Sequence, residues 1–147
     1  MQNILISSDH KGLFLKSSII EHAVHGGYNI VDCGTDSSES CDYPDYAHKL
    51  CKKISEGDLG ILICHTGIGM SIVANRYESI RAALCRSESD AKMCRKHNDA
   101  NILVLGSRLI SVSEAIKCLL VFLNTKFEGG RHQGRLNKFN NVDYNIT

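Results

Sequence analysis

Five short runs of apolar residues recur along the chain, and a segment with apolar residues spaced three or four apart follows each of them. Short apolar runs are typical of β-strands, and the longer spacing is typical of helices with one buried face. The run LGILIC is unbroken, which indicates a strand buried on both faces. The expected strands are 3–8, 28–34, 59–64, 80–85 and 100–106, and the expected helices are 12–24, 45–54, 69–76, 87–96 and 112–123.

Repeated strand–helix alternation predicts a parallel sheet covered by helices on both faces. We therefore expect a single-domain, three-layer α/β/α sandwich with a five-stranded parallel sheet, Rossmann-like and with right-handed connections. The domain should span 1–147, because no linker or repeat interrupts it, and the polar stretch 136–147 should form a tail. Two capping boxes, Ser87 with Asp90 and Ser111 with Glu114, should open helices.

Charge and cysteine usage exclude several classes of protein. Seventeen basic residues balance sixteen acidic ones, so no overall field favours nucleic acid or a membrane surface. The longest later apolar run, 118–123, is too short to span a bilayer. Charged residues follow the first apolar run at once, which argues against a secretory signal. Seven cysteines without a CxxC pair predict reduced thiols, no metal site and a cytoplasmic location.

Candidate site residues follow three of the predicted strands. Ligands of open α/β sheets bind beyond the carboxyl ends of the strands. Asp9 and His10 follow the first strand, the loop CHTGIGMS follows the third, and Arg108 follows the fifth. Gly67 and Gly69 would let consecutive amides face one concavity that holds a phosphate or a developing anion. The dinucleotide fingerprint is incomplete, because Ile72 replaces its third glycine. The alternative is an ordinary strand-to-helix turn.

Cys64 ends the third strand beside this loop, where amides and a helix start favour the thiolate form. A thiolate there could act as a general base. The alternative is a buried structural cysteine, since cysteine is among the most buried residue types. Asp9 likewise could be only a helix cap, with His10 an incidental surface residue. We expect core positions for the other cysteines: Cys33, Cys41, Cys51, Cys85, Cys94 and Cys118.

Two further segments carry charge. In GGRHQGR, a helix would place Arg131 and Arg135 on one face, and paired guanidinium groups match a phosphate dianion. The alternative is a solvated basic surface. His97 and Asn98 precede the fifth strand, so they belong at the sheet edge opposite Cys64. If they share a site with Cys64, a neighbouring subunit supplies them, which predicts a homodimer with shared sites.

The pattern as a whole resembles the type B ribose-5-phosphate isomerases, whose relatives act on galactose and allose phosphates. The segments that carry the resemblance are SSDHKG (7–12), DCGTDSSESCDYPDYA (32–47), GILICHTGIGMSIVANR (60–76), RKHNDANILVLGSR (95–108) and FEGGRHQGR (127–135). They cover about residues 3–135 in order. The resemblance implies strand order 2-1-3-5-4 and a dimer with sites between subunits.

The resemblance also implies roles. Cys64 would move a proton between C1 and C2 of the opened sugar, and His97 would open the ring. Thr66 and the amides of the 67–71 loop would hold the enediolate; the loop comprises Gly67, Ile68, Gly69, Met70 and Ser71. Asp9 and Tyr43 would contact hydroxyls, with Asn98 assisting. The phosphate clamp would comprise His10, Arg108, Arg131 and Arg135. This proton shift requires no metal or redox cofactor. His65 departs from the glycine common at that position, and we expect it to face solvent.

The function expected is therefore interconversion of D-ribose 5-phosphate and D-ribulose 5-phosphate in the non-oxidative pentose phosphate pathway. One alternative is an isomerase of a six-carbon sugar phosphate. Another is a non-enzymatic nucleotide- or flavin-binding module, which the glycine loop motivates. The incomplete fingerprint and the lack of tryptophan argue against that module.

Overall fold

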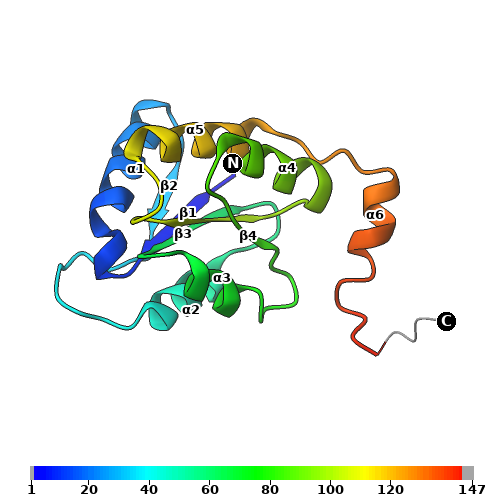
Figure 1. Ribbon diagram of the computed structural model, residues 1–147, viewed down its shortest axis with the longest axis horizontal. Coiled ribbons are helices and arrows are strands. Elements are labelled where there is room, and N and C mark those ends of the chain that lie inside the picture. Colours follow the sequence, from blue (N-terminus) through cyan, green and yellow to red (C-terminus); the bar gives the residue numbers. More distant parts are fainter. Residues whose placement is uncertain (1, 144–147) are drawn as a thin grey trace.

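The computed structural model describes residues 2–143, which form one three-layer α/β/α domain (Figure 1). The strands are β1 (Ile4–Ser8), β2 (Ile30–Asp32), β3 (Leu59–Cys64), β4 (Ala82–Leu84) and β5 (Ile102–Gly106). The helices are η1 (His10–Gly12, 3-10), α1 (Leu13–His25), α2 (Tyr43–Lys53), α3 (Ile68–Ala74), α4 (Glu88–Asn98), α5 (Val112–Asn124) and α6 (Arg131–Leu136). All strand pairs are parallel, in the order β2-β1-β3-β5-β4, which confirms the predicted sheet.

β3 is the central strand, and all six of its residues are buried. It pairs with β1 on one side, where Ile63 lies opposite Ser8, and with β5 on the other, where Cys64 lies opposite Gly106. This register aligns the carboxyl ends of the three longest strands. The segments that follow β1, β3 and β5 therefore leave the sheet at one edge.

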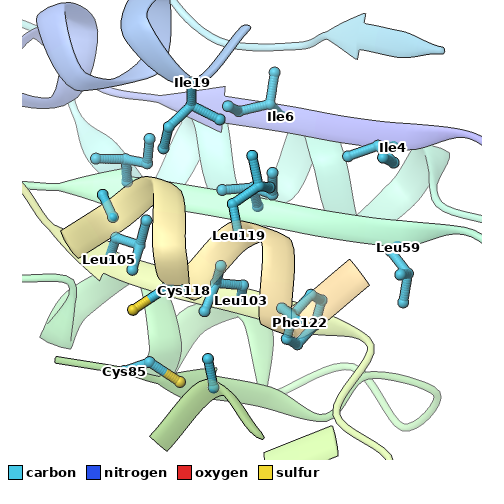
Figure 2. Packing of buried hydrophobic residues seen from close by; sticks show 14 of the residues in the cluster. Ile4, Ile6, Ile19, Leu59, Cys85, Leu103, Leu105, Cys118, Leu119 and Phe122 are labelled. Atoms are coloured by element: carbon cyan, nitrogen blue, oxygen red, sulfur yellow. The ribbon is translucent and has the colours of Figure 1, made fainter. Parts of the chain in front are cut away.

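Alternate residues of β3 face opposite layers. Ile61 and Ile63 belong to the core under α1, α4 and α5, whereas Leu62 and Cys64 belong to the core under α2 and α3. Figure 1 shows the same division of helices between the two faces. In the first core, Leu119 and Phe122 of α5 pack over the sheet with no exposed surface (Figure 2). The thiol of Cys64 thus lies on the α2–α3 side.

Both predicted caps form, but neither completes a capping box. Ser87 Oγ accepts from Asp90 N at 3.2 Å, and Ser111 Oγ accepts from Glu114 N at 3.1 Å. The carboxylates then bond elsewhere. Asp90 accepts from the amide of Arg86 at 3.0 Å, and Glu114 accepts from the amide of Glu88 at 3.1 Å. The first turn of α4 has amides without an intrahelical acceptor, so the carboxylate of the neighbouring helix α5 satisfies one of them.

The predicted tail is only partly a tail. Leu136 ends α6, and the chain continues in turns, with Phe139 N donating to Leu136 O at 3.0 Å. Asn140 Nδ2 then donates to Glu78 O at 3.1 Å, which ties this stretch to the body of the domain. Residues 144–147 of the predicted tail lie outside the described residues. Between residues 2 and 143, no helix combines the length and the apolar character needed to cross a bilayer.

Candidate active site

Cys64 lies at the carboxyl end of β3 and is 4% exposed. Its Sγ accepts a hydrogen bond from Gly67 N at 3.2 Å. The side chain is buried, as the structural alternative expects. A purely structural cysteine needs no amide donor, whereas the N–H that points at this sulfur stabilises negative charge on it. The strand end therefore fixes a sulfur at the start of an amide-rich turn.

The turn depends on Gly67, which has a left-handed backbone with φ of 76°. A side chain there would also meet Leu84 Cδ1 at 2.5 Å and the backbone carbonyl carbon of Leu105 at 3.0 Å. After it, Ile68 begins α3, and Ile68 N donates to Thr66 Oγ1 at 3.3 Å. A helix cannot satisfy its own first-turn amides, so those of Gly69 and Met70 are available to an anion. These amides follow Cys64 directly along the chain, and the concavity that they would line stays a prediction.

Gly69 corrects one part of the prediction. It lies within α3 and is absent from the residues with positive φ, so it supplies no special backbone conformation. Glycine is needed there because the ring of Tyr43 lies against it: an added Cβ would overlap the Tyr43 ring. Tyr43 begins α2 and is 38% exposed. The close approach places the phenol beside the amide turn, as a hydroxyl-binding role would require.

Asp9 is the N-cap of η1, so the structural role considered for it is confirmed. Its Oδ1 accepts from Lys11 N at 3.0 Å and from Gly12 N at 3.1 Å, and the residue is 5% exposed. His10 is half-buried, and its Nδ1 accepts from Cys41 N at 3.2 Å. This bond fixes the tautomer of His10, with the proton on Nε2. Nε2–H is then a donor for a ligand at this edge.

Arg108 follows β5 at the same edge, with its backbone amide donating to His65 O at 2.9 Å. Both side chains are exposed, which confirms the expectation that His65 faces solvent. They line a shallow depression together with Lys11, Phe14 and Ser107. One edge of the sheet therefore gathers a thiol, a carboxylate, an imidazole, a phenol and a guanidinium group.

The remaining predicted residues lie at the other edge. His97 and Asn98 end α4, and α6 carries Arg131 and Arg135, whose side chains are exposed. α6 packs beyond the end of α4, away from the carboxyl ends of the strands (Figure 1). The topological prediction for His97 is thus correct, and the chain does not bring the four predicted phosphate ligands together within one subunit.

Two residues of these surroundings were missed by sequence reasoning. Lys16, 2% exposed, donates from Nζ to Asp32 Oδ2 and to Thr35 O, each at 2.7 Å, and so anchors the loop that leads to Tyr43. A lysine in an otherwise apolar helix face was its only signal. His132 stacks on His97, with ring centroids 4.5 Å apart. The sequence pattern gave a role to the neighbouring arginines, Arg131 and Arg135, and none to His132.

His97, Glu128 and His132 place their ligand atoms within 4.8 Å of one another, which is close enough to consider a metal ion. Three features disfavour one. The imidazole planes are only 19° apart, so their nitrogen lone pairs do not converge. Lys96 Nζ already holds Glu128 at 2.6 Å, and the adjacent arginines add positive charge. The prediction of no metal site stays a prediction, and the donor set fits an ion poorly.

The other cysteines divide into two groups. Cys51, Cys85, Cys94 and Cys118 are buried core residues, as predicted, whereas Cys33 and Cys41 are half-buried in the loop after β2. Burial raises the pKa of Cys51 to about 11 and that of Cys118 to about 11, so both stay protonated. These thiols have packing roles. Every cysteine lies within the described residues, and none of the seven forms a disulfide.

An open parallel sheet with these groups beyond its carboxyl ends defines the class of α/β proteins that bind small anionic ligands at that edge. Comparison with known proteins narrows the class. A model of the Ribose/Galactose Isomerase family matches residues 4–139, and the chain belongs to this family.

The relatives are similar over almost the whole chain. The chain is 51% identical over 138 residues to a putative sugar phosphate isomerase of Rickettsia bellii, covering 92% of this chain and 96% of that protein. It is 42% identical to the ribose-5-phosphate isomerase B of Escherichia coli, with 92% and 93% covered.

Solved structures agree with the fold. A ribose 5-phosphate isomerase of Thermotoga maritima superposes with a TM-score of 0.93 at 48% identity, covering 96% of this chain and 99% of that one. The ribose-5-phosphate isomerase B of Mycoplasma genitalium, solved with bound ribulose-5-phosphate, gives 0.88 at 45% identity, with 96% and 95% covered. The predicted family is confirmed.

Proposed function

We propose that this protein is an aldose–ketose isomerase that interconverts D-ribose 5-phosphate and D-ribulose 5-phosphate, in the cytoplasm and within the non-oxidative pentose phosphate pathway. The observation that carries the proposal is the thiol of Cys64, held by Gly67 N at 3.2 Å at the start of the amide turn. Similarity to a structure with bound ribulose-5-phosphate supports the choice of substrate.

The chemistry begins with a sugar whose ring must open, and we assign this step to His97. The thiolate of Cys64 then removes the proton from C2 of the open aldose, and the electrons move onto O1 to give an enediolate. Returning the proton to C1, with transfer of the hydroxyl proton from O2 to O1, gives the ketose. The atoms balance without an external oxidant or reductant.

A proton next to a carbonyl is weakly acidic, so the oxyanion must be stabilised. We assign this to Thr66 and to the amides of the turn that begins at Gly67. Removing one donor from such a site typically costs ~10²–10³ in rate. These amides belong to a turn whose backbone is fixed before substrate binds, so little reorganisation is needed. Asp9 and Tyr43 would orient the sugar hydroxyls, with Asn98 assisting.

We assign the phosphate to His10 and Arg108 of one subunit and to Arg131 and Arg135 of a second. The support is their location at opposite edges of a single chain, with His97 at the same edge as the second pair. A homodimer in which each active site takes one edge from each subunit would complete the set. Phosphate binding at a distance from C1 and C2 would hold these atoms against the base.

Mixing two variants that each lose most of the activity tests the shared site. Cys64→Ser and His97→Ala each remove one half of the site, and unfolding and refolding them together gives mixed dimers. One site of each mixed dimer then has both wild-type residues. With random pairing, half of the dimers are mixed, so about a quarter of wild-type activity should return. No recovery, with mixed dimers shown by native mass spectrometry, would place each site within one subunit.

A coupled assay in EDTA-containing buffer tests the reaction itself. Purified protein should interconvert the two pentose phosphates, and allose 6-phosphate and galactose 6-phosphate should be measured side by side. A higher kcat/KM on a six-carbon substrate would move the assignment within the family. No turnover of any of these sugars would refute the isomerase proposal.

A further inference from the structure

Among the residues at the sheet edge opposite Cys64, one buried side chain, His132, has no assigned role. His132 is 5% exposed, whereas the arginines on either side of it in the same short helix are exposed. Its Nε2 is buried and has no hydrogen-bond partner among residues 2–143. Glu128 Oε2 lies 3.5 Å from this nitrogen. Burying a polar nitrogen in this way is unfavourable, so a compensating interaction is expected.

That interaction is the stack on His97. The two ring centroids are 4.5 Å apart and the ring planes are 19° apart, which is face-to-face contact. The chain reaches this position through Gly129 and Gly130, whose φ values of 67° and 56° are left-handed. Since the turn brings α6 back against the end of α4, the His132 ring covers one face of the His97 ring.

The charges around His132 favour a neutral ring. Burial, followed by the charges of His97, Arg131 and Arg135, lowers the pKa of His132 below its ordinary value. Glu128 acts in the opposite direction, but its carboxylate is also held by Lys96 at 2.6 Å. A neutral His132 imidazole can stack on the His97 ring without charge repulsion.

We propose that His132 is a positioning residue for His97, whose stacked ring holds the His97 imidazole in the orientation needed to act on the sugar ring oxygen. The inference rests on the proposed function, because it takes ring opening by His97 as given. His132 itself contacts neither the sugar nor a metal ion. The functional group is the flat ring, and its nitrogens are dispensable.

Three substitutions separate the ring from its nitrogens. His132→Phe keeps a flat ring and should retain kcat within about threefold. His132→Ala and His132→Gln remove the ring and should lower kcat by about 10–100-fold, the scale of a misplaced catalytic group. KM should change little, because the arginines of α6 remain. Gln133→Ala, an exposed neighbour on α6, is the matched control and should match the wild type in kcat, KM and Tm.

A double-mutant cycle tests whether His132 acts through His97. In a His97→Ala background, His132→Gln should have no further effect on kcat, since nothing remains to be positioned. The double-mutant cycle does not use the His132→Phe variant, so it remains informative if that variant does not fold. Full additivity of the two losses would overturn the proposal. A rise in KM with unchanged kcat would also overturn it, because it would show that His132 only anchors α6.

Two further results would count against the inference. If His132→Phe is as slow as His132→Ala, the nitrogens are needed. If micromolar Zn²⁺ inhibits the wild type, EDTA reverses this, and the phenylalanine variant is insensitive, the cluster is a metal site. Wild-type protein without isomerase activity would instead refute the proposed function, so the two failures are distinguishable.

Discussion

Gly67→Ala should destabilise the fold, because both the backbone and the surroundings of residue 67 exclude a side chain. With φ at 76°, an alanine would be held in the left-handed region, which costs about 1–2 kcal/mol for a residue with a Cβ. The added carbon would also lie 2.5 Å from Leu84 Cδ1 and 3.0 Å from the Leu105 carbonyl carbon. Leu105 belongs to the buried strand β5, so its backbone cannot withdraw.

The overlap adds an overpacking term of about 1–3 kcal/mol, which gives about 2–5 kcal/mol in all. For a domain of this size, 1 kcal/mol lowers Tm by about 2–4 °C, so a fall on the order of 10 °C is expected. Gly69→Ala is the matched control. That position is helical, where alanine is favoured over glycine by about 1 kcal/mol. Its added carbon meets the Tyr43 ring, which is partly exposed and can move.

Thermal unfolding followed by circular dichroism distinguishes the two substitutions. Gly67→Ala should unfold well below the wild type. Gly69→Ala should keep or raise Tm, and it should lose activity because the phenol of Tyr43 is displaced. A Gly67→Ala protein that melts within about 2 °C of the wild type would refute the reasoning, since the expected cost is several times larger. Equal losses of Tm for both variants would contradict the contrast between fixed backbone and movable ring.

Three other outcomes are expected. Cys64→Ser should keep Tm and substrate affinity while kcat falls more than ~10³-fold, because an alcohol is far less acidic than a thiol and supplies no anionic base near neutral pH; steady-state kinetics and calorimetry check this. Arg135→Ala should raise KM for ribose 5-phosphate by about 10–100-fold without lowering Tm, and lysine should rescue only part, because it cannot bind phosphate with two parallel bonds. The pKa of His132 is lowered in the folded state, so the unfolded chain binds more protons than the folded one below pH ~6.5. The free energy of unfolding should therefore decrease as the pH is lowered through this range. When the pH is lowered from 7.5 to 5.5, a range in which Glu128 stays ionised, the Tm of the wild type should fall more than the Tm of His132→Phe.

The sequence was informative about elements that repeat a pattern and less so about contacts between elements. Strand 59–64 was predicted to the residue, because an unbroken apolar run ends at a polar loop. The predicted edge strands 28–34 and 80–85 shrink to three residues each, since an edge strand has a neighbour on only one side. The need for glycine at position 69 was assigned to the backbone, but it comes from Tyr43, which is distant in sequence.

The same limit explains the site. Cys64 and its loop are contiguous, so their spacing predicts a thiol beside amides, and the hydrogen bond from Gly67 N confirms it. The opposite location of His97 also followed from the chain order. The stack of His132 on His97 did not, because it joins α4 to a helix more than thirty residues later through a glycine turn. Periodic spacing of apolar residues predicts which face of a helix or strand is buried. It does not predict a single contact between two distant helices, such as this stack.

The two halves of the proposed site differ in how firmly the fold holds them, and this should be measurable. Cys64 ends the central strand β3 and Gly67 lies in the turn that follows it. Both residues are buried, and the hydrogen bond from Gly67 N to Cys64 Sγ joins the turn to the strand. The far half consists of exposed arginines on α6, a six-residue helix that contacts little besides α4. Regions with few buried contacts open at low free-energy cost. Hydrogen exchange should therefore release the α6 amides well before those of β3. Phosphate or substrate should slow exchange in α6 if its arginines bind the ligand, and equal protection of α6 and β3 in the free protein would contradict this account.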